Sequence, residues 1–313
     1  MRNAFRLQDA RARGTVSGMP EITIRGVIAS LLTPFDAHGS IDWELLAAHA
    51  SRAESAGVHA VCAGGIASEL AGSTPNEFGR VCQTIRAAVR IPLLANIYPD
   101  STLEAIELAH AAAEAGVSVL LVAQPHYLFQ PGAEALADML QELRRQAALP
   151  LMIANTVRTA MLSAAAIMRL MERGAIDGIE QGGGDAHILA DLLCLPGRPP
   201  VYSAIDELAY LGQLLGAEGT LSTLAAVFPA ECVGVYEAHR EGDHERARRM
   251  HNRLLRIWRV LDHPSELLAR TKLAAALRGS PAGVARSPYQ FSSPESGVIV
   301  REALLREGMV TAS

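Results

Sequence analysis

The chain has 313 residues, of which 50% are hydrophobic and 19% are charged, and its formal net charge is −5 at pH 7. This composition allows a substantial buried core, and the negative charge argues against nucleic-acid or acidic-membrane partners, which select for basic surfaces. No apolar run approaches the roughly 20 residues that a membrane-spanning helix needs, so no membrane partner is expected.

The N-terminal segment, residues 1–22, predicts a flexible leader. It carries four arginines but lacks the hydrophobic stretch of a secretory signal. Four cysteines are scattered along the chain without a CxxC pair: Cys62, Cys82, Cys194 and Cys232. We therefore expect reduced, buried thiols in a cytoplasmic protein.

From residue 23, short apolar runs alternate with longer segments of helical periodicity. Eight runs predict strands: Gly26–Leu32, His59–Ala63, Pro92–Ile97, Val117–Ala123, Pro150–Asn155, Ile176–Glu180, Val201–Ala204 and Gly219–Ser222. The segments between them have apolar residues three and four positions apart, and they predict seven helices: Asp42–Ala56, Pro75–Val89, Thr102–Ala115, Glu134–Ala147, Ala164–Arg173, Ala186–Leu193 and Glu207–Leu215.

Strands that are apolar throughout must be covered on both faces, which favours a parallel sheet wrapped by helices. Eight such strands joined by helical crossovers predict a (β/α)8 TIM barrel over residues 23–225, a unit that commonly spans about 250 residues. A Rossmann fold is disfavoured because no GxGxxG motif follows the first strand.

The alternation stops after residue 225. Four further segments have helical character: Pro229–His239, Asp243–Leu261, Pro264–Leu277 and Ser296–Glu307. They predict a C-terminal helical domain over residues 226–313. Lys272, the only lysine of the chain, falls in the third of these segments, where we expect a surface or helix-packing role rather than catalysis.

Several short motifs occur in a specific order and spacing: Leu32–Asp42, Gly65–Glu69, Pro125–Tyr127, Asn155–Thr159, Gly178–Glu180, Ser203–Asp206 and Gly216–Pro229. In this order they resemble the dihydrodipicolinate synthase / N-acetylneuraminate lyase family of class I aldolases and dehydratases, over about Ile24 to Met309. The resemblance implies a homotetramer or homodimer without a cofactor. It also implies a barrel lysine that forms a Schiff base with pyruvate or a related 2-oxo acid.

This chain departs from the family pattern at the reacting centre. Glu180 stands at the position of the Schiff-base lysine, and Ala154 stands at that of the proton-shuttling tyrosine. The two threonines that bind the pyruvate carboxylate in the family are Ile66 and Ala67 here. A carboxylate cannot form the iminium through which an amine acts as an electron sink, so the sequence excludes the family mechanism. Backbone N–H groups of the Ile66–Ala67 loop could still bind an anion.

Sites on this fold lie at the C-terminal ends of the strands. We expect Glu180 to be a desolvated general acid or base; a salt bridge or hydrogen bond that fills the space of the lost lysine is the alternative. His126 or Tyr127 would assist proton transfer. A subunit contact is the alternative for His126, and Tyr127 matches the family tyrosine that completes a neighbour's site. Arg158 would hold a substrate carboxylate.

The remaining substrate-binding candidates are Asn155, Thr159, Glu69, Ile66, Ala67 and Ser222. For Glu69 the alternative is that it anchors its own loop. Asp206 and Asp185 are expected to cap the helices that follow them. Glu180, His126, Asp185 and His187 are metal-type donors, but their spacing matches no strong motif, so no metal is expected.

The sequence thus predicts a lyase-type enzyme that carries out aldol cleavage, condensation or dehydration on a small 2-oxo acid or related carboxylate, without a Schiff base. The alternative is a non-catalytic ligand-binding or regulatory protein on the same barrel, because a fold does not dictate a function.

Overall fold

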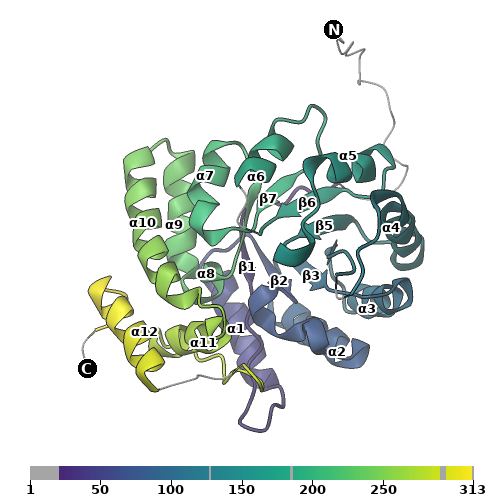
Figure 1. Ribbon diagram of the computed structural model, residues 1–313. Coiled ribbons are helices and arrows are strands. Elements are labelled where there is room, and N and C mark those ends of the chain that lie inside the picture. Colours follow the sequence, from purple (N-terminus) through teal and green to yellow (C-terminus); the bar gives the residue numbers. More distant parts are fainter. Residues whose placement is uncertain (1–20, 127, 184–185, 290–293, 312–313) are drawn as a thin grey trace.

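Eight parallel strands close into a barrel in the computed structural model, which describes residues 21–126, 128–183, 186–289 and 294–311 (Figure 1). The strands are β1 (Gly26–Ser30), β2 (Ala60–Ala63), β3 (Leu93–Ile97), β4 (Val119–Val122), β5 (Leu151–Asn155), β6 (Gly178–Gln181), β7 (Val201–Ser203) and β8 (Gly219–Ser222). Each pairs with its neighbours in sequence, and β1 pairs with β8. The predicted (β/α)8 barrel is confirmed.

Helices surround this barrel on the outside (Figure 1). They are α1 (Trp43–Ser55), α2 (Pro75–Ala88), α3 (Thr102–Glu114), α4 (Ala133–Ala147), α5 (Ala164–Glu172), α6 (Ala186–Leu193) and α7 (Ala209–Leu214). Four of them begin where a side-chain oxygen accepts a hydrogen bond from a backbone N–H of the first turn, which satisfies a donor that the helix leaves unpaired. The capping residues are Asp42, Thr74, Ser101 and Ser163.

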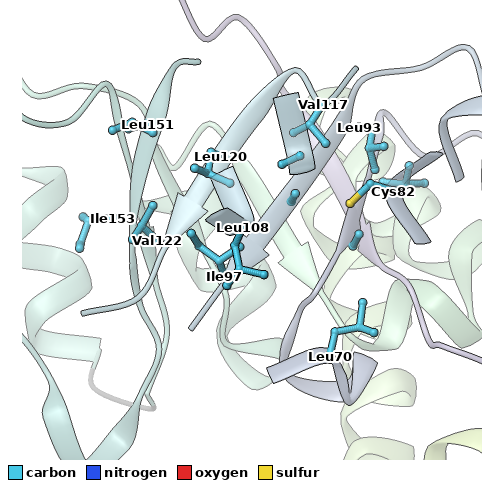
Figure 2. Close-up of a cluster of buried hydrophobic side chains, with 14 of the residues drawn as sticks. Leu70, Cys82, Leu93, Ile97, Leu108, Val117, Leu120, Val122, Leu151 and Ile153 are labelled. Atoms are coloured by element: carbon cyan, nitrogen blue, oxygen red, sulfur yellow. The ribbon is translucent and has the colours of Figure 1, made fainter. Parts of the chain in front are cut away.

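Two apolar layers form because successive side chains of a strand point to opposite faces. One layer fills the barrel and includes Ile28, Leu94 and Tyr202. The other lies between the strands and the helices, where Leu93 and Leu120 pack with residues such as Leu108 of α3 (Figure 2). The parity of a strand residue therefore decides whether its side chain lies inside the barrel.

The C-terminal helices are α8 (Leu224–Val227), α9 (Pro229–Arg240), α10 (His244–Leu261), α11 (Leu267–Leu277) and α12 (Pro294–Arg306). They share an apolar cluster of their own, in which Leu254, Trp258 and Val300 pack together. Helix α9 packs against α10 and contacts β1, and α11 contacts α8, so these helices cover one side of the barrel (Figure 1). Helix α8 was not predicted, because four residues are too short to show a helical period.

A surface or a helix-packing role was expected for Lys272; it is buried in α11, which excludes the surface role. Two of the four cysteines differ from the expected burial. Cys62 and Cys82 are buried as expected, whereas Cys232 is partly buried and Cys194 is exposed at the end of α6. All four thiols are free. Within the described ranges, no helix is long and apolar enough to cross a membrane.

Candidate active site

Glu180 lies inside the barrel near the C-terminal end of β6. Its neighbours in the sheet register are Ala154 and Tyr202, which both belong to the apolar layer that fills the barrel. Its side chain is only 2% exposed. Burial raises the pKa of the Glu180 carboxyl from 4.5 to about 8, because the charged form loses its hydration. The carboxyl is therefore largely protonated at neutral pH.

Three side chains interact with this carboxyl: Asn96 of β3, Tyr98 directly after β3, and Cys62 of β2. The Asn96 amide nitrogen donates to Glu180 Oε2 at 3.2 Å and to the Tyr98 hydroxyl at 3.3 Å. Burial, and then the charge of Glu180, raise the pKa of the Tyr98 phenol above its ordinary range. The same two causes raise the pKa of the Cys62 thiol. Glu180, Asn96 and Cys62, which are buried, and Tyr98, which is partly buried, thus form one polar group, the barrel cluster.

The barrel cluster has the properties of an acid–base centre. A carboxyl with a pKa of about 8 can donate a proton and take it back near neutral pH, which is the condition for efficient general acid–base catalysis. Catalytic residues of this fold are concentrated at the C-terminal ends of the strands, and groups with strongly shifted pKa values are concentrated at functional sites. Glu180 meets both conditions. The hydrogen bond from Asn96 fixes the direction in which the carboxyl points.

A glycine allows β2 and β3 to approach each other beside the cluster. Gly64 follows β2 with φ of +78°, and a Cβ at this position would lie 2.1 Å from the Asn96 carbonyl oxygen. Only glycine fits that space, since a side chain would displace the Asn96 backbone. Gly64 thus helps to position Asn96, whose side-chain amide donates to Glu180.

Asn155 and Ser222 are not brought together with Glu180. Each follows a residue of the inner layer on its strand and so points outward. The Asn155 amide nitrogen donates to the Leu162 carbonyl at 3.0 Å and to Gln181 Oε1 at 2.8 Å, and its oxygen accepts from Leu162 N at 2.8 Å. Asn155 therefore organises the loop after β5.

Ser222 belongs to a second buried group, with Asp206. The Ser222 hydroxyl donates to Asp206, whose other oxygen accepts from Thr223 N at 3.1 Å. The expectation that Asp206 caps the helix directly after it is wrong: its carboxylate instead satisfies donors at the start of α8. Burial raises the pKa of Asp206 to about 7. Asp185, the other predicted cap, lies outside the described residues.

Arg158 and Thr159 of the predicted anion site lie in an exposed loop, and His126 is partly exposed. The Arg158 side chain is 72% exposed and lies 4.0 Å from Asp262 Oδ2. Thr159 is exposed, and its carbonyl accepts from Gln130. The ring of His126, in the loop after β4, contacts the Gln124 carbonyl at 3.2 Å. Neither Arg158 nor His126 has a recorded polar contact with Glu180 in the part of the chain that the structure describes. Tyr127 lies outside that part.

Glu69 lies in the loop after β2 and makes two strong contacts. Its Oε1 is 2.6 Å from Lys272 Nζ, and its Oε2 accepts from Arg286 N at 2.6 Å. Lys272 also donates to the carbonyls of Thr33 and Val284, both at 2.7 Å. All three ammonium protons therefore have partners, and the buried pair ties the loop to the C-terminal helices.

Ile66 and Ala67 precede Glu69 in a short 3-10 helix, Ile66–Ser68. Ile66 is exposed, whereas Ala67 is buried and packs in the apolar cluster of the C-terminal helices. Among the described residues, no group of three His, Cys, Asp or Glu side chains could hold a metal ion.

Asn96 and Tyr98 are recognisable in the sequence as polar residues at a strand end, but neither they nor Cys62 were assigned a role in the site, although a signal for them exists. Asn96 and Tyr98 lie two and four positions after Leu94, so they share its inward parity. Cys62 lies two positions after the inward Ala60. Strand parity, applied to every polar strand residue, would have separated these three from Asn155 and Ser222.

Comparisons with known proteins agree with this architecture. The model of the Dihydrodipicolinate synthetase family matches residues 23–304. A 4-hydroxy-tetrahydrodipicolinate synthase from Methanopyrus kandleri is 30% identical over 294 residues, which cover 92% of this chain and 97% of that relative. One from Pseudomonas aeruginosa is 28% identical over 292 residues, covering 92% and 99%. The crystal structure of dihydrodipicolinate synthase from Aquifex aeolicus has a TM-score of 0.83 at 26% identity and covers 92% of this chain and 100% of that chain.

Proposed function

Because this chain belongs to the dihydrodipicolinate synthetase family, we propose that it is an aldolase-type lyase that acts on a small carboxylate substrate. We further propose that it works without a Schiff base, with Glu180 as its central general acid and base. The observation that carries the second proposal is the Glu180 carboxyl inside the barrel, hydrogen-bonded by Asn96 and with a pKa raised to about 8.

A neutral carboxyl can replace the Schiff-base amine of the family in one respect, because it can help the substrate carbonyl to accept an electron pair. Cleavage of a β-hydroxy carbonyl compound leaves an electron pair that must move into the carbonyl group. Protonated Glu180 would donate its proton to the carbonyl oxygen as the carbon–carbon bond breaks, so that an enol forms instead of an enamine. A second base must remove the hydroxyl proton, and His126 and Tyr127 are the proposed candidates. Acid catalysis of this kind contributes about 10²–10⁴-fold in rate.

The contacts of Lys272 support a mechanism without an imine. It is the only lysine in the chain, so no other ε-amine is present. Its ammonium is buried, paired with Glu69 at 2.6 Å and bonded to two backbone carbonyls. An amine must reach the substrate carbonyl before it can attack. Burial lowers the pKa of Lys272 although Glu69 opposes the loss of its proton, so it is the three contacts of Nζ that keep this amine from a substrate.

Substrate binding is proposed for the loops around the strand ends. Arg158 has an exposed guanidinium suited to a carboxylate, and Thr159 is exposed beside it. The loop of Ile66, Ala67 and Glu69 would contribute backbone N–H groups. Asn155 and Ser222 would act indirectly, through the loops that their hydrogen bonds hold.

Turnover of a panel of 2-oxo and β-hydroxy acids tests the proposal. For any acid that the protein converts, Glu180→Gln should lower kcat at least a hundredfold, since Gln keeps the Asn96 contact but cannot transfer a proton. Asp206→Asn is the matched control: it removes another buried carboxyl with a raised pKa, but one outside the barrel. Equal losses in both variants would contradict the role of Glu180. Binding without turnover, unchanged in Glu180→Gln, would favour the non-catalytic binding protein.

Trapping with borohydride tests the absence of a Schiff base separately. Incubation with pyruvate and borohydride should add no mass to any peptide of the barrel or to the peptide containing Lys272, as read by mass spectrometry. A reduced pyruvoyl adduct on Lys272 would refute the proposed mechanism while leaving the lyase activity intact.

We also propose that the protein assembles as a homodimer or homotetramer. The segments that follow β2, β3 and β4 expose large apolar side chains: Ile66, Leu103 in the first turn of α3, Leu128 and Phe129. Exposure reaches 83% at Phe129, which is costly in water and typical of an interface. Light scattering of the full chain should report a dimer or larger assembly, and a monomer at micromolar concentration would exclude this.

A further inference from the structure

A pocket outside the barrel has no part in the proposed reaction. It has a volume of about 190 Å³ and lies between α1, the junction of α8 and α9, and the turn that follows α11. Its polar and apolar walls include His49, Arg52, Val227, Glu231, Arg278 and Ser280. An engineered apolar cavity of about 150 Å³ holds benzene, so this pocket, the α1 pocket, has room for a small organic molecule.

The charged side chains of the α1 pocket leave an excess of one positive charge. Arg278 is paired with Glu231 at 2.5 Å and also donates to the Met309 carbonyl. Arg52 donates to the Gly279 carbonyl at 2.9 Å, and over the described part of the chain it forms no ion pair. Its guanidinium has five N–H donors, so most of them are available to an anion.

His49 does not add to this charge. Burial, and then the charges of Arg52 and Lys272, lower its pKa to about 4, so the ring is neutral at pH 7. Leu32 N donates to His49 Nε2 at 3.3 Å, which places the ring proton on Nδ1. That nitrogen faces the Ser280 hydroxyl at 3.5 Å. The proton of the Ser280 hydroxyl is then directed away from His49 and is available to a ligand.

Part of the lining of the α1 pocket is apolar. Ala53, Ala226 and Val227 form this apolar wall, and all three are buried. An inorganic anion has only charged oxygens to place against this wall, so it would gain no binding free energy from burial of apolar surface. A short hydrocarbon chain would bury apolar surface against it, while a carboxylate at its other end reached Arg52.

We propose that the α1 pocket binds a small aliphatic monocarboxylate, held by the guanidinium of Arg52 and the hydroxyl of Ser280 with its chain against Val227. One negative charge matches the single uncompensated positive charge, and the size matches the pocket volume. The site is separate from the barrel cluster and does not depend on the proposed reaction.

Ligand-observed NMR titration of the full-length protein with sodium butyrate, at constant chloride, tests the proposal. Wild type should bind butyrate saturably. Arg52→Gln should weaken the affinity about tenfold or more, the loss expected for a charge-assisted hydrogen bond. Ala230→Leu should also weaken it, because Ala230 is an exposed residue of the pocket lining and a larger side chain there would occupy the space.

Arg86→Gln is the matched control. Arg86 lies in the last turn of α2 as Arg52 does in α1, and it likewise bonds a backbone carbonyl, that of Val89. Arg86→Gln and Glu180→Gln should both keep the wild-type affinity. The proposed binding in the α1 pocket would be refuted if wild type showed no saturable binding of butyrate. It would also be refuted if Arg86→Gln weakened the affinity for butyrate as much as Arg52→Gln does. Loss of binding in Glu180→Gln would place butyrate in the barrel and refute it as well.

Discussion

Replacing Glu180 with glutamine should change how the stability of the protein depends on pH. The folded carboxyl has a pKa of about 8, against 4.5 for the free group. Between these values the folded protein keeps a proton that the unfolded chain releases. The stabilisation from this proton is complete below pH 4.5 and is lost as pH rises toward 8. Glutamine has no such proton, and its oxygen can still accept from Asn96.

The size of the effect follows from the two pKa values. In the interval between them, wild type should lose about 1.4 kcal/mol of unfolding free energy per pH unit through this group. From pH 5 to pH 8 the loss amounts to about 3–4 kcal/mol, because the slope is incomplete at both ends. Glu180 is 2% exposed, so solvent does little to screen the effect.

Urea denaturation followed by circular dichroism at several pH values would measure the difference. Subtracting wild type from Glu180→Gln cancels the other titrating groups, including Asp206 with its pKa of about 7. The difference should be near zero at pH 5 and grow to about 3–4 kcal/mol in favour of the variant at pH 8. If unfolding free energy plotted against pH gave parallel curves for wild type and Glu180→Gln, Glu180 would not be a buried, neutral carboxyl. The acid–base role proposed for it would then be refuted as well.

Two further substitutions test the supports of the site. Lys272→Met should destabilise the protein by about 3–5 kcal/mol, because it leaves the Glu69 carboxylate buried without its partner, and a second change, Glu69→Gln, should restore part of that loss in urea unfolding. A fully additive double variant would contradict this coupling. Gly64→Ala should lower the urea midpoint more than Gly216→Ala, since both glycines have positive φ but only at Gly64 would the new Cβ meet the Asn96 carbonyl. Equal midpoint shifts would show that the contact with Asn96 is not tight.

The fold could be predicted because its signals are local. In α4, Leu136, Met139 and Leu143 recur at helical spacing, and all three are buried against the barrel. The strand runs were recognisable because both of their faces are covered, so they contain few polar residues. The 3-10 helices and α8 span only three or four residues, which is about one turn and too short for an apolar repeat to be seen in the sequence.

The candidate site could be predicted only at its centre. Two independent arguments select Glu180: it occupies the position of the family's Schiff-base lysine, and it lies at the end of a predicted strand. The role of Lys272 could not be derived, because its partner Glu69 is about two hundred positions away and no sequence pattern links them. Arg158 has suitable chemistry, but sequence spacing does not reveal that its side chain is exposed at the rim.

The burial of Lys272 also determines how the protein would respond to amine-directed reagents. With one lysine in the chain and that lysine enclosed, an activated ester or aldehyde cross-linker would find no ε-amine on the native surface. Modification of Lys272 would occur only when α11 separates from the loop after β2, so acylation at that residue would report the opening of this contact.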